Sequence, residues 1–543
     1  MSSVVGAIPG AIAGAANVVT NVAWFIPLLA AAIAYFQYEL MDPEARPIDV
    51  ETTLLMEKYD FIIIGGGSAG AVLANRLSEV EEWNVLLLEA GGDETEISDV
   101  PLLAAYLQLS KLDWQYKTEP QGTACLAMKN KRCNWPRGKV IGGSSVLNYM
   151  LYVLYYFKKS EDNRNPYLSR TTYHSTGGYL TIQEAPWHTP LAAAFVQAGQ
   201  EMGYENRDIN GKFQTGFMIA QGTVRRGARC STAKSFLRPA RLRKNLHLAM
   251  HSHATKLLIN PTTRMAYGVE FYRDGNKYTV HATKEVILSA GAIGYENVPS
   301  VLRYAMLGDG PLTVMGGVEG LAFVNTKYAN QSDDFPDIEF HFVSGSTNSD
   351  GGNQVRKAHG LTDEFYKEVF EPINNQDVWS AIPVLLRPKS RGIIKLRSRN
   401  PFAYPFIYPN YFFEPFDMKT LVEGVKIAIA MSKTKSFQRF GSTLYNKSFP
   451  ACKSIPFYTD YYWECMIRQY SVTIYHPVGT CKMGPKWDTE AVVDAQLRVY
   501  GIKGLRVIDA SIMPTLVSGN TNAPVIMIAE KGSDLIKAFW KKL

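Results

Sequence analysis

The chain has 543 residues and a net charge of only +7, from 57 basic and 50 acidic side chains, without any block of five or six like charges. This weak excess argues against a nucleic-acid-binding protein. Hydrophobic residues at 46%, aromatic residues at 12% and charged residues at 20% are globular values that exclude disordered, collagen-like and coiled-coil chains. The length provides a sizeable core and more than one domain.

The N-terminal residues predict export or membrane targeting. No charged residue occurs before Glu39, and residues 18–38 are almost continuously apolar, long enough to cross a hydrocarbon layer of about 30 Å as a helix. A cleaved signal peptide and an uncleaved anchor both fit, since small residues that suit cleavage occur at 32–34. We therefore expect a protein that is secreted, or attached to a membrane through 18–38, with the bulk of the chain outside the cytosol. Residues 1–57 are predicted to hold this segment and a linker.

Six cysteines are too few for a disulfide scaffold and lack zinc-type spacing, so we expect no metal site. Cys125 with Cys133, and Cys452 with Cys465, could close short loops in an oxidising compartment. Buried free thiols are an equally good interpretation of each pair. Glycosylation sequons at Asn330 and Asn446 are compatible with export.

A nucleotide-binding unit is predicted at the start of the folded part, near Lys58. An apolar run at 60–64 precedes the motif GGGSAG at 65–70, a helical pattern follows, and a second apolar run at 84–88 ends in Glu89. The first glycine permits a tight turn, the second lets backbone N–H groups approach a pyrophosphate, and the third allows helix and strand to pack closely. Glu89 follows at the distance where a carboxylate can bind an adenosine ribose. The unit alone fits either FAD or NAD.

Further blocks extend this layer. The cluster PRGKVIGGSS at 136–145 reads as a glycine loop, while residues 285–291 and 504–509 are apolar strands that end in small or acidic residues. The nucleotide-binding layer is thus predicted to combine three separated parts of the chain. Strand-like stretches at 180–183 and 392–397 and helical patterns at 420–433 and 458–470 predict a mixed substrate domain between them.

The segment around 392–397 is also strongly basic. An anionic partner is one interpretation, but the alternation through Lys395-Leu396-Arg397 favours the solvent-facing side of a strand. Its cations are Arg387, Lys389, Arg391, Lys395, Arg397 and Arg399.

The candidate catalytic residues lie near the C-terminus. His476 stands among small and turn-forming residues in YHPVGTCKMG, and Asn520 lies in the amide-rich turn SGNTNAP. A neutral imidazole can take a hydroxyl proton while a side-chain amide hydrogen-bonds the same oxygen.

These blocks, in this order from Lys58 to Ile536, resemble the glucose-methanol-choline (GMC) family of FAD oxidoreductases, including its insect glucose dehydrogenases. The resemblance implies an α/β, Rossmann-like FAD-binding domain of glutathione-reductase type, and an α+β substrate domain with an antiparallel sheet. By position, the first would comprise residues 58–160, 225–300 and 471–543, and the second residues 161–224 and 301–470. FAD is thereby favoured over NAD. The implied reaction is oxidation of an alcohol or sugar by hydride transfer to flavin N5, with electrons passed to a quinone-type or other acceptor.

The resemblance also assigns residues. His476 matches the catalytic base and Asn520 its partner. The positions that match cofactor contacts are Gly65, Gly67, Ser68, Ala69, Gly70, Glu89 and Ala90 in the ADP-binding unit, Val140, Gly143 and Asn148 along the flavin, Ala254 at adenine, and Asp509 and Ala510 at the ribityl and pyrophosphate part.

Two family segments are missing, at the joins 153–154 and 293–298, both beside flavin-contacting blocks. We hypothesise an exon-skipped product or an incomplete gene model, and we expect weak or absent FAD retention from the chain as written. The missing segments also support an alternative, a catalytically silent relative that acts as a binding protein. A third interpretation is an oxidase that uses O2. Neither the particular alcohol nor the oligomeric state follows from the sequence.

Overall fold

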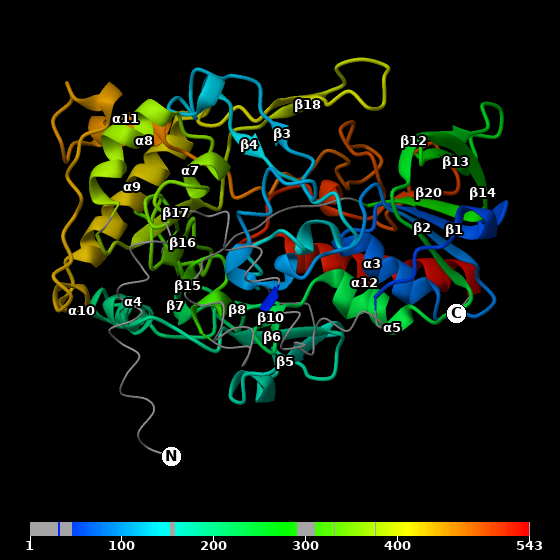
Figure 1. The fold of residues 1–543 in the computed structure, drawn as a ribbon, viewed down its shortest axis with the longest axis horizontal. Coiled ribbons are helices and arrows are strands. Elements are labelled where there is room, and N and C mark those ends of the chain that lie inside the picture. The colour runs from blue at the N-terminus through cyan, green and yellow to red at the C-terminus, as the bar shows by residue number, and fades with distance from the viewer. Residues whose placement is uncertain are drawn as a thin grey trace.

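The computed structural model describes residues 31–32, 46–152, 158–289, 310–330, 332–374 and 376–541. Both joins lie outside these ranges, as does nearly all of the apolar segment 18–38. Within the described ranges, no helix combines the length and apolarity needed to cross a membrane. The described residues form two parts, each built around a β-sheet (Figure 1).

The first part is built on a seven-stranded sheet. Its strands are β1 (Lys58–Ile64), β2 (Val85–Leu88), β11 (Leu246–Ala249), β12 (His253–Ile259), β13 (Ala266–Arg273), β14 (Asn276–Leu288) and β20 (Leu505–Val507). The order is β11-β2-β1-β14-β13-β12, with β20 beside the end of β14. Because β11, β2, β1, β14 and β20 are mutually parallel, their carboxyl ends share one edge. The predicted layer from three separated parts of the chain is confirmed.

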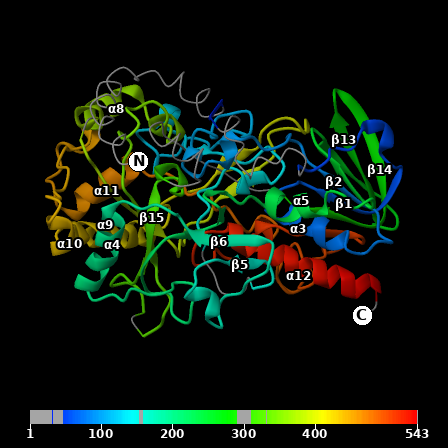
Figure 2. The ribbon, with the colours of Figure 1, turned by 60° about the horizontal axis from the view of Figure 1, so that its bottom comes forward.

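Two helices cover one face of this sheet. They are α3 (Ser68–Leu77) and α12 (Asn522–Lys541), which lie side by side in both views (Figures 1 and 2). Val72 and Ile526 are fully buried between the helices and the sheet, and each such side chain stabilises the fold by about 1.5–3 kcal/mol. The N-termini of the two helices are tied together, because Ser68 Oγ donates to Asn522 Oδ1 at 2.6 Å.

The second part holds an antiparallel sheet, as the family resemblance implied. Its order is β17 (Ser380–Leu385), β16 (Ile338–Val343), β15 (Val318–Val324) and β7 (Gly216–Ile219). The helices α4 (Pro190–Glu201), α9 (Pro415–Ser432) and α10 (Lys435–Gln438) pack against it. The residue limits predicted for the two domains stay a prediction.

The other strands and helices lie outside these two sheets. The strands are β3 (Tyr116–Lys117), β4 (Asn134–Trp135), β5 (Glu161–Asn163), β6 (Leu180–Glu184), β8 (Gln221–Gly222), β9 (Val224–Arg225), β10 (Ala228–Arg229), β18 (Ile393–Lys395) and β19 (Phe406–Tyr408). The helices are α5 (Arg238–Ala240), α7 (Val355–Ala358), α8 (Asp363–Val369) and α11 (Asp460–Gln469).

The stretch predicted as a linker is ordered against the first sheet from Arg46 onward. Arg46 forms an ion pair with Asp93 at 3.0 Å, and the carboxylate of Asp49 accepts from Met250 N and binds Arg273. Arg46 and Asp49, which the sequence suggested were part of a linker, therefore belong to the folded part.

The interpretation of the basic segment as the solvent-facing side of a strand is confirmed at Lys395, which is exposed on β18, whereas Arg397 is exposed but lies beyond the end of the strand. β18 spans only three residues, pairs only with β19, and exposes all three side chains. Leu396, which the alternation would turn inward, is 87% exposed, so the alternation does not mark a buried side of the strand.

Both proposed cysteine pairs are disulfides, so the free-thiol interpretation of them is wrong. The Cα atoms are 5.8 Å apart in Cys125–Cys133 and 5.9 Å apart in Cys452–Cys465. Cys230 and Cys481 are thiols.

The close approach of α3 to the glycine turn gives a first prediction. A Cβ at position 70 would overlap the carbonyl oxygen of Gly65, whereas a Cβ at Gly122 would meet nothing within 4 Å. We expect Gly70→Ala to lower the free energy of unfolding by about 1–3 kcal/mol or more, and Gly122→Ala to change it little. Urea unfolding measures both; equal stability of the two variants would contradict this packing.

Candidate active site

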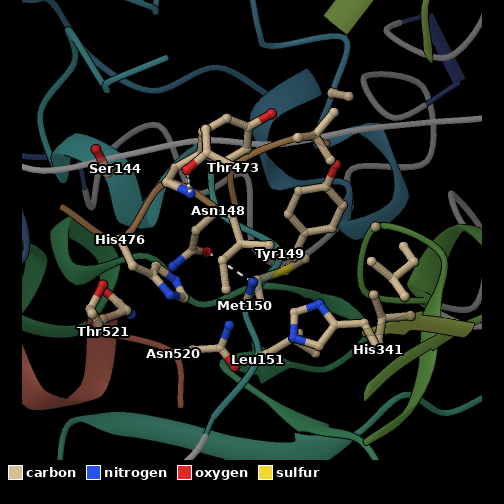
Figure 3. A pocket seen from close by; sticks show the side chains of 18 of the residues that line it. Ser144, Asn148, Tyr149, Met150, Leu151, His341, Thr473, His476, Asn520 and Thr521 are labelled. Carbon is tan, nitrogen blue, oxygen red and sulfur yellow. Dashed lines mark hydrogen bonds between the residues drawn. The ribbon is translucent and has the colours of Figure 1, made fainter. Parts of the chain in front are cut away.

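A cavity of about 850 Å³ lies between the carboxyl edge of the first sheet and the antiparallel sheet. Elements far apart in the sequence line it: the start of α3, the loop that carries His476, the turn before α12, and β16. In Figure 3 the side chains of His476, Asn520 and His341 point toward a common space. The structure thus brings together the two residues predicted to be catalytic.

The backbone that presents His476 is strained and held in place. Tyr475 has φ of 66°, an uncommon conformation for a residue with a side chain. Its N–H donates to Thr473 Oγ1 at 3.0 Å, and its carbonyl accepts from Arg137 Nη1 at 3.1 Å. These bonds fix the peptide that precedes the imidazole, and such strain is concentrated at functional sites.

The imidazole of His476 is neutral at physiological pH. Burial, together with the neighbouring His341 and Arg137, lowers its pKa to about 3. A neutral ring has a lone pair that can take a proton from a bound hydroxyl group.

Asn520 offers a free polar atom to the same space. Its Oδ1 is buried and has no hydrogen-bond partner in the described part of the chain. A buried amide oxygen without a partner is costly, so a ligand group that bonds to it would be favoured.

His341 is a lining residue that the sequence analysis missed. Its Nε2 lies 3.1 Å from Oε1 of Glu339, a fully buried carboxylate whose Oε2 has no hydrogen-bond partner among the described residues. The two polar residues alternate along β16 with Ile338, Phe340 and Phe342, which pack into the core. The alternation of polar and apolar residues in the stretch IEFHFV could have predicted this, because successive side chains of a strand point to opposite faces and one face is then polar. The sequence analysis also missed the contacts of Arg137 and Thr473 with Tyr475, because no local sequence pattern predicts them.

The start of α3 has the chemistry of an anion site. Gly67 caps the helix without any side-chain bond, so the first N–H groups, at Ser68, Ala69 and Gly70, lack intrahelical partners. Ser68 and Ala69 line the cavity. Gly65, with φ of 99°, makes the tight turn that aims these groups at the ligand.

The second glycine block lies against this turn. Gly142 N donates to Gly66 O at 2.7 Å, while Val140 forms a bridge with Gly92 and Gly143 has positive φ. Asn148 lines the cavity, and its Oδ1 accepts from Met150 N at 2.9 Å and from Arg229 Nη1 at 3.0 Å.

The other assigned positions divide into two groups. Asp509 and Ala510 line the cavity, and Asp509 Oδ1 accepts from Ser511 N at 2.9 Å. Glu89, Ala90 and Ala254 lie outside the lining.

Glu89 braces the glycine turn. Its two carboxylate oxygens accept from Gly66 N at 2.7 Å and from Gly91 N at 2.8 Å, and burial raises its pKa to about 7. Its contact with a ribose stays a prediction, as do the cofactor contacts assigned to Ala90 and Ala254.

Together, the free N–H groups at α3, the glycine contacts and the apolar cavity fit a dinucleotide with a flat ring system. Among the described residues, no group of three or more His, Cys, Asp or Glu side chains could hold a metal ion.

Two sequence profiles of GMC oxidoreductases match the chain, the N-terminal one over residues 59–316 and the C-terminal one over residues 388–529. The chain belongs to the GMC oxidoreductase family. It is 39% identical to glucose dehydrogenase [FAD, quinone] of Drosophila melanogaster, over 93% of this chain and 91% of that protein. It is 34% identical to alcohol dehydrogenase [acceptor] of Pseudomonas putida, over 88% and 95% of the two chains.

A solved structure confirms the fold. Pyridoxine 4-oxidase from Mesorbium loti superposes with a TM-score of 0.72 at 24% identity, over 88% of this chain and 98% of that one. Within the GMC family, FAD is the cofactor of this chain, and its reaction class is the oxidation of an alcohol or sugar hydroxyl.

The low pKa of His476 gives a second prediction. The pKa of His476 is about 3 in the folded state and has the ordinary value of 6.5 in the unfolded state. Between these two values the unfolded chain binds a proton that the folded chain does not, so this group lowers the free energy of unfolding as the pH falls from 6.5 toward 3. In NMR spectra of histidine-labelled protein, we expect the signal that is lost in His476→Asn to stay that of a neutral ring down to pH 5. A midpoint near 6.5 for that signal would contradict the burial argument.

Proposed function

We propose that this GMC oxidoreductase uses His476 as the base that removes the hydroxyl proton of an alcohol or sugar, and that it passes electrons to a quinone-type acceptor. The observation that carries the first part is the neutral imidazole of His476, whose side chain points with that of Asn520 into the cavity that the N-terminus of α3 also lines (Figure 3). Within this proposal the cofactor contacts are those assigned above by position.

Each group of the proposed site has its own role in the reaction, which follows from its chemistry. FAD, when bound, accepts the hydride from the carbon that carries the hydroxyl group. His476 takes the hydroxyl proton at a ring nitrogen, while the side-chain Nδ2 of Asn520 donates a hydrogen bond to the same oxygen. Arg137, through the carbonyl of Tyr475, keeps the imidazole in place.

The quinone-type acceptor is supported by the printed name of the Drosophila relative, which includes a quinone. An O2-using oxidase is the second candidate, since the same fold is found in the oxidase named above. Formation of peroxide under air at the rate of alcohol oxidation would favour the oxidase. Faster turnover with a soluble quinone than with air would favour the proposal.

We also propose that the enzyme works outside the cytosol, either secreted or attached to a membrane through residues 18–38. The two disulfides support this location, because such bonds persist in oxidising compartments.

The test that separates an enzyme from a silent binding protein is an anaerobic absorption spectrum of the protein purified with added FAD. Addition of a panel of alcohols and sugars should bleach the flavin band with at least one of them. A protein that holds FAD but is bleached by none would favour the silent relative. The flavin content of protein purified without added FAD tests the expectation of weak retention, and stoichiometric flavin would contradict that expectation.

The base assignment gives a third prediction. We expect His476→Ala to lower kcat/KM with an artificial acceptor by about 10²–10⁴-fold while FAD binding is kept, because the proton acceptor is lost. His281→Ala, which changes a histidine of β14 outside the cavity lining, is the matched control and should retain activity. Activity of His476→Ala at the level of the control would remove His476 from the mechanism.

A further inference from the structure

A projecting ribbon next to the cavity carries an unusual combination of side chains. We call residues 387–404, which include β18 and the loop toward β19, the basic hairpin; it extends outward at the top of Figure 1. No acidic residue occurs between Asp377 and Glu414, whereas the hairpin holds six cations. They are Arg387, Lys389, Arg391, Lys395, Arg397 and Arg399.

The protein itself uses only some of these cations. Arg387 donates to Ser518, and Arg397 pairs with Glu119 at 2.9 Å. Lys395 and Arg399 form no ion pair with any carboxylate of the described residues, and every residue from 391 to 402 is exposed. Their charge is therefore available to an external partner.

Apolar side chains stand among these free cations. Leu396 is 87% exposed, Phe402 51% and Ile393 48%. Single exposed apolar residues are ordinary, but here three of them lie within residues 393–402 of one ribbon. Alternating apolar and cationic side chains suit the boundary of an anionic bilayer, where apolar groups enter the acyl region and cations meet phosphates and carboxylates.

The hairpin is held in a fixed position by both parts of the molecule. The ring of Phe402 lies 5.0 Å from that of His253 and 5.5 Å from that of Tyr272, and Tyr404 lies 4.8 Å from Tyr116. On the other side Ile394 lines the active-site cavity. The exposed tip is therefore presented at the rim of the cavity.

We propose that the basic hairpin docks the enzyme on the surface of an anionic lipid bilayer. A polyanionic glycan would engage the cations but leave Leu396 and Ile393 in water, which is why lipid fits better. Where the quinone proposal also holds, and this clause rests on it, docking brings the cavity rim to the phase in which lipophilic quinones dissolve.

The test places an environment-sensitive fluorophore at Leu396→Cys in the full chain. Vesicles of phosphatidylcholine with phosphatidylserine should shift its emission to the blue, and pure phosphatidylcholine or high salt should weaken this shift. In the same labelled chain, Lys395→Gln with Arg399→Gln should raise the lipid concentration at half-shift by about fivefold for each charge removed. The label reports its own surroundings, so vesicle binding through residues 18–38 does not produce the shift.

Trp487→Cys, labelled in the same way, is the matched control. Trp487 is 83% exposed and follows Lys486, but Asp488 and Glu490 lie beside it. Both labelled chains share Cys230 and Cys481, so background labelling is the same. No shift at 396, or an equal shift at 396 and 487, would overturn the proposal. Heparin binding that needs Lys395 and Arg399, without a vesicle shift, would also overturn it and assign the hairpin to a soluble polyanion. The assay contains no alcohol or acceptor, so its outcome is independent of the quinone proposal.

Discussion

The alignment of five parallel strand ends along one sheet edge is the constraint on which the rest of the molecule depends. Ile64 lies in register with Leu88 and with Leu288, and Leu288 with Val507. The residues that follow four of these strands, namely the glycine turn, Glu89, Ser289 and Asp509, must then meet at that edge. Helix α3 can begin there only because glycines allow the backbone to turn sharply and pack closely. The free N–H groups at the start of α3 and the loop that carries His476 both reach the cavity at this edge.

Burial determines what the site can do chemically. An exposed histidine would be partly protonated near neutral pH, whereas His476 is kept neutral by its surroundings and by nearby positive charge. The same burial raises the pKa of Glu89, so the carboxylate depends on the backbone N–H groups of Gly66 and Gly91 for stabilisation. Burial therefore shifts the pKa values of two groups of the molecule, the His476 imidazole and the carboxylate that braces the glycine turn.

Much of this could be predicted from sequence because its signals are local. The strand, glycine turn and helix around Gly65 lie within one short stretch, and the loop of His476 and the turn of Asn520 each carry a compact motif. The site residues that the sequence analysis missed owe their place in the site to contacts between residues far apart in the sequence. Arg137 matters because it reaches the carbonyl of Tyr475, and His341 because β16 pairs into a sheet that faces the cavity. In the basic hairpin the local signal was only partly right, since Lys395 is exposed on a strand as expected, but Leu396, which the alternation would turn inward, is exposed as well.

A crystal structure of the FAD-loaded enzyme with a bound, unreactive alcohol analogue tests the central claim most directly. The account predicts that the analogue's hydroxyl oxygen lies within hydrogen-bond reach, about 2.6–3.2 Å, of both the His476 ring and the Asn520 amide, with its carbon facing flavin N5. A hydroxyl group held by other side chains, with the imidazole turned away from the flavin, would contradict it.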